Sequence, residues 1–323
     1  MKKTFLQFLL TTGIIIAFVA SPVLAYEIQD LADTPVRDDF VLGPGKTELW
    51  MDPGDSFIKQ LLITNRLGKT MNFKIAIEDF EGSRNPEETV VLKGEERGLF
   101  SLKDYFHLEI SEFILSHGQR MVLPVEISIP EDAEPGGLYG IVLVSTTPPE
   151  LTTEVEKEKA KGQMSLITRL GTLFFIRVKG DVVEDGFLKE LKIKEAKKFY
   201  EKGPISFEIL FENNGNVHLT PYGIIEITNL FGKKVGEVEV DPYFAMPDSV
   251  RLREVQWNRE FLFGRYTASL LLNRGYQDMI DRKSVEFWII PWKVILTGLV
   301  ILFLIILFLR WIASHFEIRR KRV

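Results

Sequence analysis

The sequence predicts an all-β exported protein with two immunoglobulin-like β-sandwich domains in tandem, followed by one C-terminal transmembrane helix. Three observations support this fold class. Short apolar segments with two-residue alternation recur between turn residues from Leu49 to Leu272. The chain has no cysteine and 24 phenylalanines, so apolar burial rather than disulfides must hold its core. An uncharged apolar run, Val294 to Leu309, lies near the C-terminus.

The N-terminal segment has the pattern of a secretory signal. Lys2 and Lys3 precede an apolar stretch that ends in small residues. This pattern predicts a signal peptide over residues 1–25, with cleavage between Ala25 and Tyr26. The alternative is an uncleaved anchor helix.

The C-terminal apolar segment predicts a transmembrane helix within residues 288–311. From Trp292 to Trp311 it has 20 residues, which as a helix spans about 30 Å, the thickness of a bilayer core. The two tryptophans lie where interfacial aromatic residues occur, and Lys293 and Arg310 are close enough to the ends to reach the headgroups. These four residues are the predicted membrane-interface residues.

The tail, residues 312–323, is basic. Arg319, Arg320, Lys321 and Arg322 stand against the single acid Glu317. Basic flanking segments stay on the cytoplasmic side of the membrane. The tail is therefore predicted to be cytoplasmic, and the N-terminal domains are predicted to be extracellular or periplasmic, on a single-pass cell-membrane protein. Binding of the tail to anionic lipid or to a cytosolic partner is the alternative interpretation.

The predicted ectodomain is acidic. Without the signal and the region from Trp288 onward it has 32 basic and 44 acidic residues, a formal charge of −12. Phosphate backbones are bound by clustered lysine and arginine. The composition therefore argues against a nucleic-acid partner.

The first domain is predicted over residues 26–180 from its alternating segments. The expected strands are Phe57–Thr64, Phe73–Ile77, Met121–Ile129, Leu138–Val144 and Leu166–Val178. Pro124 has no N–H to donate, which predicts an edge or a bulge for its strand. The glycine-rich entrance at Gly136 and Gly137 favours a central position for the strand that follows.

Two segments of this domain are predicted to lie outside the sheets. Residues Ser101–Phe106 fit one helical turn with Ser101 as its cap. Residues Pro148–Gly162 are polar and charged, which predicts an exposed hairpin loop.

The second domain is predicted over residues 181–287. Its expected strands are Leu188–Ile193, Ile205–Phe211, Gly223–Thr228, Val235–Val240, Val250–Trp257 and Tyr266–Leu272. Gly264 and Tyr266 resemble the entry to a tyrosine corner, although any buried tyrosine with a bonded hydroxyl would serve as well. The two domains share a weak repeat with an offset of 150, in which Ser56 and Phe57 correspond to Ser206 and Phe207.

No motif for catalysis or metal binding is evident. His107, His117, His218 and His315 are not at metal-ligand spacing, and no cysteine can complete a site. The acid pairs Glu87–Glu88 and Glu95–Glu96 are adjacent in sequence, whereas glycoside hydrolysis needs carboxylates across a cleft. We therefore predict a non-enzymatic protein with no catalytic residues, no cofactor and no metal.

Aromatic residues in turns are the better candidates for a binding surface. They are Trp50, Phe231, Tyr243 and Phe244. For each of them, packing in the core is the competing interpretation.

Several turn and core motifs of the first domain resemble the WxL-interacting surface proteins. They are Phe40-x-Leu42-x-Pro44, Leu49 with Pro53-Gly54-Asp55, Leu61-x-Ile63-x-Asn65, and Pro130 with Pro135-Gly136-Gly137-Leu138-Tyr139-Gly140. The layout of a signal peptide, two sandwiches, one helix and a basic tail is similar as well. The resemblance implies peptidoglycan binding by the first domain and binding of a host or partner protein by the second.

From these observations we predict a membrane-anchored bacterial cell-surface protein that acts as a binding or scaffold protein. Its expected partners are peptidoglycan or another surface protein, together with membrane lipid through the C-terminal helix. Two alternatives remain open at this point. One is a membrane-tethered, chaperone-like assembly factor that uses edge-strand pairing, and the other is an accessory subunit of a surface hydrolase.

Overall fold

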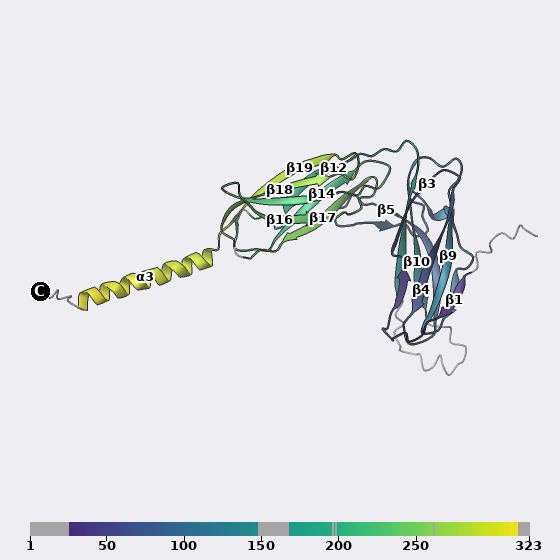
Figure 1. Cartoon of the computed structure of the whole chain (residues 1–323), viewed down its shortest axis with the longest axis horizontal. Coiled ribbons are helices and arrows are strands. Elements are labelled where there is room, and N and C mark those ends of the chain that lie inside the picture. The colour runs from purple at the N-terminus through teal and green to yellow at the C-terminus, as the bar shows by residue number, and fades with distance from the viewer. Residues whose placement is uncertain (1–25, 148–167, 196, 198, 261, 316–323) are drawn as a thin grey trace, which may run out of the picture. The chain divides into compact units, whose positions relative to one another are not determined.

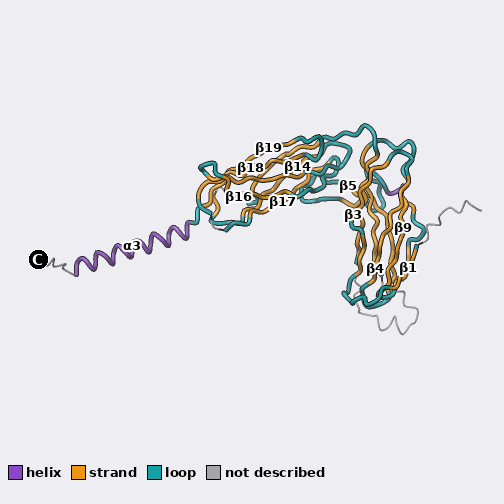
Figure 2. The backbone as a smooth tube through the Cα atoms, in the orientation of Figure 1, coloured by secondary structure: helices purple, strands orange, loops and turns teal. Residues whose placement is uncertain are grey.

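The computed structural model describes residues 26–147, 168–195, 197, 199–260 and 262–315. The predicted signal with Ala25, the predicted loop Pro148–Gly162 and the basic run Arg319–Arg322 lie outside the described residues. The described chain forms four β-sheets and one long helix (Figures 1 and 2). The all-β prediction of two sandwiches with one C-terminal apolar helix is confirmed.

The chain divides into two compact units. The first contains residues up to Glu81 together with Leu92–Val182, and the second contains Gly82–Val91 and the chain from Val183 onward. The sequence analysis had placed residues 82–91 in the first domain. They belong to the second unit, where the N–H of Val250 donates a hydrogen bond to the carbonyl of Ser83 at 3.0 Å.

The first unit is a sandwich of two sheets. Its elements are β1 (Glu27–Asp30), β2 (Phe40–Gly43), β3 (Lys46–Met51), β4 (Ser56–Asn65), β5 (Met71–Glu81), β6 (Val91–Leu92), the 3₁₀ turn η1 (Lys103–Tyr105), β7 (Phe106–His107), β8 (Glu112–Leu115), β9 (Gln119–Ser128), β10 (Gly136–Thr147) and β11 (Arg169–Val178). One sheet has the order β1-β9-β4-β2, with β7 also on β9. The other has the order β3-β11-β10-β5-β6, with β8 also on β5.

The second unit repeats this plan. Its elements are β12 (Gly186–Ile193), β13 (Phe199–Tyr200), β14 (Ile205–Asn213), β15 (Tyr222–Asn229), β16 (Lys234–Val240), β17 (Ser249–Trp257), β18 (Gly264–Asn273), β19 (Ile280–Ile289) and the helix α3 (Trp292–His315). Its sheets have the orders β12-β14-β17 and β13-β19-β18-β15-β16. In both units a short strand pairs in parallel with the last long strand, β3 with β11 and β13 with β19.

Phenylalanine fills the interiors, as expected for sandwiches without a disulfide. In the first unit Phe73 is fully buried, meets Phe40 edge-on and stacks on Phe113, with ring centroids 5.4 Å apart in both pairs. In the second unit Phe287 packs against Phe207 and stacks on Tyr266. Each aromatic pair adds about 0.5–1.5 kcal/mol beyond the area that it buries.

Several local predictions are borne out and one is wrong. Strand β10 is central, because it pairs with both β5 and β11. The hydroxyl of Tyr266 bonds to the backbone N–H and C=O of Phe263, both at 3.2 Å, as in a tyrosine corner. Ser101 does not cap η1. The buried carboxylate of Asp79 instead accepts the N–H groups of Leu102 and Lys103, at 3.0 and 2.9 Å.

A buried asparagine ends the equivalent strand of each unit. The side chain of Asn65 donates to the carbonyls of Lys69 and Leu115, and that of Asn213 donates to the carbonyls of Val217 and Ala245. Both side chains are completely buried. The offset between them is 148, so the repeat that the structure supports differs in register from the expected offset of 150.

Replacing Asn213 with Ala should destabilise the second unit by about 2–3 kcal/mol, because buried backbone carbonyls would lose their donor. Urea unfolding of residues 26–290, which keep β19 whole, measures this, with Trp257 as the fluorescent probe and with Trp50 and Trp288 replaced by Phe. The matched control is Asn214→Ala, an exposed neighbour, which should change stability by less than about 0.5 kcal/mol. Equal effects of the two substitutions would contradict the assigned role of Asn213.

Candidate functional site

The described residues contain no group of three or more His, Asp or Glu side chains arranged to hold a metal ion. Two of the histidines outside α3 are engaged in the fold, since the ring of His117 contacts the carbonyl of Thr34 at 2.9 Å and His218 is buried. Of the acid pairs, Glu88 accepts a hydrogen bond from Ser83 and Glu95 lies 3.7 Å from the ammonium of Lys103. We therefore examined the sheet edges and exposed apolar side chains as binding surfaces.

The predicted edge position of the strand that contains Pro124 is wrong. Strand β9 pairs along one side with β4, over residues 120–128. On its other side β1 covers residues 119–122 and β7 covers residues 126–127. Pro124 lies in the gap between these two short partners, where a missing N–H breaks no ladder bond.

The open edge of this sheet is on β4 instead. Strand β2 pairs only with Leu62–Asn65, and the chain then crosses at Pro44 to the other sheet, where β3 pairs with β11. Residues Ser56–Leu61 are therefore paired with β9 alone among the described strands. We call the vacant side of Ser56–Leu61 the β4 edge.

The direction of the backbone groups on β4 follows from its flanking hydrogen bonds. The N–H of Arg66 donates to the carbonyl of Asp39, on the β2 side, whereas the carbonyls of Asn65 and Asp55 accept bonds from the β9 side. Backbone groups alternate along an antiparallel strand, and the β4–β9 register is continuous. The N–H and C=O groups of Ile58 and Gln60 therefore point to the vacant side.

Apolar side chains accompany this edge on both faces of the sheet. Phe57 faces the interior, in register with Ile127, and is nevertheless 37% exposed. On the outer face Ile58 is 44% and Leu62 is 38% exposed. Lys59 is the one charged residue among Ser56–Leu61.

Three other edge strands carry charges of the kind that hinder strand addition. Strand β3 has the ion pair Lys46–Glu48 at 2.7 Å, and β16 has the ion pair Lys234–Glu237. In β12, Lys192 bonds to Glu208 at 3.2 Å, and a register shift interrupts the strand. The β4 edge is more apolar than these three strands.

The second unit closes the equivalent edge. Strand β12 pairs with β14 from Phe207 to Asn213, and the N–H of Lys194 donates to the carbonyl of Ser206 at 3.0 Å, so only Ile205 extends beyond this side. In the first unit the equivalent strand β2 covers four residues and leaves six. The open edge is therefore a property of the first sandwich and not of the shared plan.

The aromatic candidates from the sequence differ in exposure. Trp50 is 61% exposed, with the guanidinium of Arg177 4.5 Å from the centre of its ring, and Phe231 is 89% exposed. Tyr243 is buried, and Phe244 is partly buried. Trp50 and Phe231 are thus exposed, as a binding surface would require, whereas Tyr243 lies in the core.

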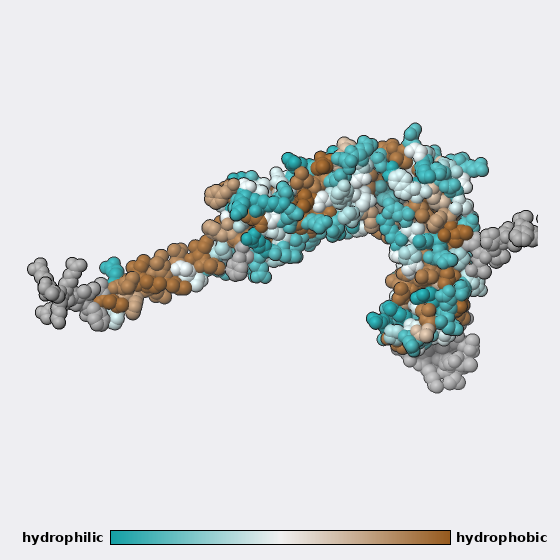
Figure 3. Space-filling model, viewed as in Figure 1, coloured by the Kyte–Doolittle hydropathy of each residue, from teal (hydrophilic) through white to brown (hydrophobic). Residues whose placement is uncertain are grey.

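The predicted membrane-interface residues lie on α3. Trp292 is 55% and Trp311 is 54% exposed. Lys293 forms an ion pair with Glu201 at 2.9 Å, and Arg310 lies one residue before Trp311. The segment Trp292–Ile312 contains an 18-residue stretch with a mean hydropathy of 2.7, none of which is buried, and is long and apolar enough to cross a membrane. Figure 3 shows apolar residues along the visible face of this helix.

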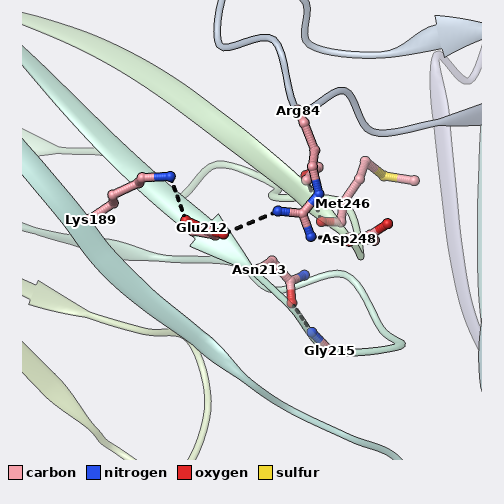
Figure 4. A network of polar contacts seen from close by, with 8 residues as sticks. Arg84, Lys189, Glu212, Asn213, Gly215, Met246 and Asp248 are labelled. Carbon is pink, nitrogen blue, oxygen red and sulfur yellow. Dashed lines mark hydrogen bonds and ion pairs between the residues drawn. The ribbon is translucent and has the colours of Figure 1, made fainter.

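An ion network within the second unit holds the segment 82–91 (Figure 4). The guanidinium of Arg84 lies between Asp248 and Glu212, 3.2 Å from the Glu212 carboxylate, and Lys189 approaches the same carboxylate at 2.8 Å. Gly82 lies so close to Ser249 that an added Cβ would come within 2.4 Å of the Ser249 Cβ. The sequence patterns gave no signal for this network, which joins residues 128 and 164 positions apart.

No protein-family model and no curated protein match the chain. Solved structures with some similarity are fimbrial chaperones. The class 5 fimbriae chaperone CfaA is 13% identical, with a TM-score of 0.37, over 78% of this chain and 100% of CfaA. The E. coli chaperone DraB is 12% identical, with a TM-score of 0.32, over 77% of this chain and 96% of DraB. Values this low carry no argument about the function of the chain.

Glu212 gives the second unit a pH-dependent contribution to stability. The hydrogen bond from Lys189 and its charge, followed by the hydrogen bond and charge of Arg84, outweigh the opposing effect of burial and lower the pKa of this carboxyl in the folded chain. A lowered folded-state pKa means that the stabilisation is complete above the unfolded value of about 4.3 and is lost as the pH falls through the folded value.

Residues 26–290 should therefore resist urea better at pH 7 than their Glu212→Gln variant, and the difference should shrink as the pH falls below about 4. The midpoint of urea unfolding, measured across this range, is the readout. Glu239→Gln is the control, since Glu239 is exposed and forms no ion pair among the described residues. A difference that is independent of pH would show that the charge of Glu212 has no part in it.

Proposed function

We propose that the protein is a membrane-tethered, non-enzymatic binding protein that captures an extended segment of a partner polypeptide on the β4 edge. The observation that carries this proposal is the six-residue vacant side of Ser56–Leu61, lined by apolar side chains on both faces. An edge of this kind is a template for strand addition.

The chemistry of the edge defines the segment that fits it. The backbone N–H and C=O groups of Ile58 and Gln60 can form hydrogen bonds with an added strand that runs parallel or antiparallel to β4. Such pairing involves only backbone groups of the added strand. Phe57 on one face and Ile58 on the other favour a strand with apolar side chains at successive positions. A partner segment that is neutral or basic suits the ectodomain charge of −12.

The size of the edge favours temporary capture. Six residues of strand are about 20 Å long, and a contact of that length falls in the class of small, transient interfaces. This supports the chaperone-like assembly factor over a permanent scaffold. Binding of peptidoglycan, which the resemblance to WxL-interacting proteins implies, stays a prediction.

The proposed attachment to the membrane rests on the helix α3. Its segment Trp292–Ile312 has the length and hydropathy of a membrane span and is not covered by protein. Tethering keeps the first unit close to polypeptides that emerge at the same membrane, which raises their effective concentration.

A photo-crosslinking amino acid at Gln60 should capture a polypeptide partner when the full chain is expressed in its own membrane. Ile58→Pro should reduce this capture at least several-fold. Because the N–H of Ile58 points to the vacant side, proline there blocks an added strand without removing a bond to β9. The measurement is the yield of crosslinked product.

Two controls make this test specific. The same crosslinker at Glu237, on the charged β16 edge, should give little product. Lys59→Pro removes a bond to β9 and should destabilise the first unit, unlike Ile58→Pro. Equal crosslinking at Gln60 and Glu237, or capture that persists in a folded Ile58→Pro chain, would refute the β4 edge as the binding site.

A further inference from the structure

Five exposed apolar side chains gather at the end of the second unit that leads into α3. They are Phe231 at 89%, Phe263 at 70%, Leu230 at 60%, Phe199 at 59% and Trp288 at 41% exposed. In Figure 3 apolar residues are visible at this end of the unit. Monomeric surfaces rarely keep so many large apolar side chains together without a partner.

The register of the sheet places these residues together. Trp288 pairs with Phe199 on one side and with Arg265 on the other. Asn229 pairs with Tyr266, so the turn that begins at Leu230 lies beside Phe263. Leu230, Phe231, Phe263 and Trp288 line one shallow pocket of about 350 Å³.

The chain between this surface and α3 is too short to separate them. Strand β19 ends at Ile289 and α3 begins at Trp292, a distance of at most about 11 Å. The N–H of Ile290 donates to the carbonyl of Tyr200 at 2.8 Å, and Lys293 is paired with Glu201. The segment between β19 and α3 is therefore fixed to β13 and the residue that follows it.

We infer that Phe199, Leu230, Phe231, Phe263 and Trp288 form an aromatic collar that inserts into the interfacial region of the membrane beside α3. This inference rests on the membrane tether of the proposed function. Each interfacial region is about 5–8 Å thick, and Trp288 is only four residues before Trp292, where the span begins, so the end of the second unit that carries the collar lies next to this region.

The composition of the collar suits this location. Phenylalanine and tryptophan are favoured where apolar bodies meet hydrated headgroups. Lys233 follows Phe231 by two residues and is exposed, so its ammonium can reach lipid phosphates. Arg259 and Arg265 line the same pocket, where Arg259 donates to the carbonyl of Val235 and Arg265 pairs with Glu286. A lipid surface is therefore favoured over a protein partner, which would need a defined and complementary apolar face.

Nitroxide labels on single cysteines measure the depth of these residues, and the native chain has no cysteine to interfere. The full chain in phosphatidylcholine nanodiscs is labelled at Phe231→Cys and, separately, at Phe263→Cys. Both side chains are highly exposed, so their replacement leaves the core intact. Power saturation compares the access of oxygen, which concentrates in lipid, with that of a water-soluble nickel complex.

Both collar labels should favour oxygen over the nickel complex at least several-fold more than a label at Ile280→Cys. Ile280 is 61% exposed and lies at the far end of β19, about 30 Å from Ile289. A label at Leu304→Cys, in the middle of α3, reports the span separately. If the labels at Phe231 and Phe263 are as accessible to the nickel complex as the label at Ile280, while the label at Leu304 is protected by lipid, the collar is refuted. The membrane tether is then still supported. A nickel-accessible Leu304 would overturn the tether, and the collar with it.

Discussion

The crossing of the chain between two sheets at Gly43–Gly45 is the constraint on which the first sandwich depends. Pro44 cannot donate to the β4 ladder, and its carbonyl accepts a hydrogen bond from the hydroxyl of Thr172 at 2.8 Å, on β11. Leu173 then donates to Gly45 at 3.0 Å, which begins the parallel pair of β3 and β11. The segment Phe40–Met51 thereby pairs with part of each sheet, through β2 on β4 and β3 on β11. The rest of β4, Ser56–Leu61, has no described strand on that side.

The second unit shows that the open edge is not required by the architecture. Both units share the parallel pair of a short strand with the last strand and a buried asparagine, Asn65 or Asn213, whose side chain binds the backbone of the following turn. They differ in where the first strand crosses. Strand β12 covers its neighbour down to Phe207, whereas β2 stops after four residues. The same fold therefore supports a closed edge in the second unit and an open edge in the first.

Local sequence patterns predicted the sandwiches and the apolar helix, because alternation and hydropathy are properties of neighbouring residues. The open β4 edge depends instead on a register between Phe40–Gly43 and Leu62–Asn65, which no local pattern contains. Pro124 predicted an edge or a bulge because proline has no N–H to donate to a neighbouring strand. Any position without a partner strand satisfies this condition, including a gap inside a sheet. Its gap between β1 and β7 arises from residues far away in the chain. The placement of residues 82–91 with the second unit likewise required the three-dimensional contacts of Arg84.

Amide hydrogen exchange on residues 26–290, followed residue by residue by NMR, tests the open edge most directly. The account predicts an alternating pattern on β4, with fast exchange at Ile58 and Gln60 and strong protection at Lys59 and Leu61, whose amides face β9. Protection of Ile58 and Gln60 equal to that of Lys59 and Leu61 would contradict it, because the vacant side would then be covered.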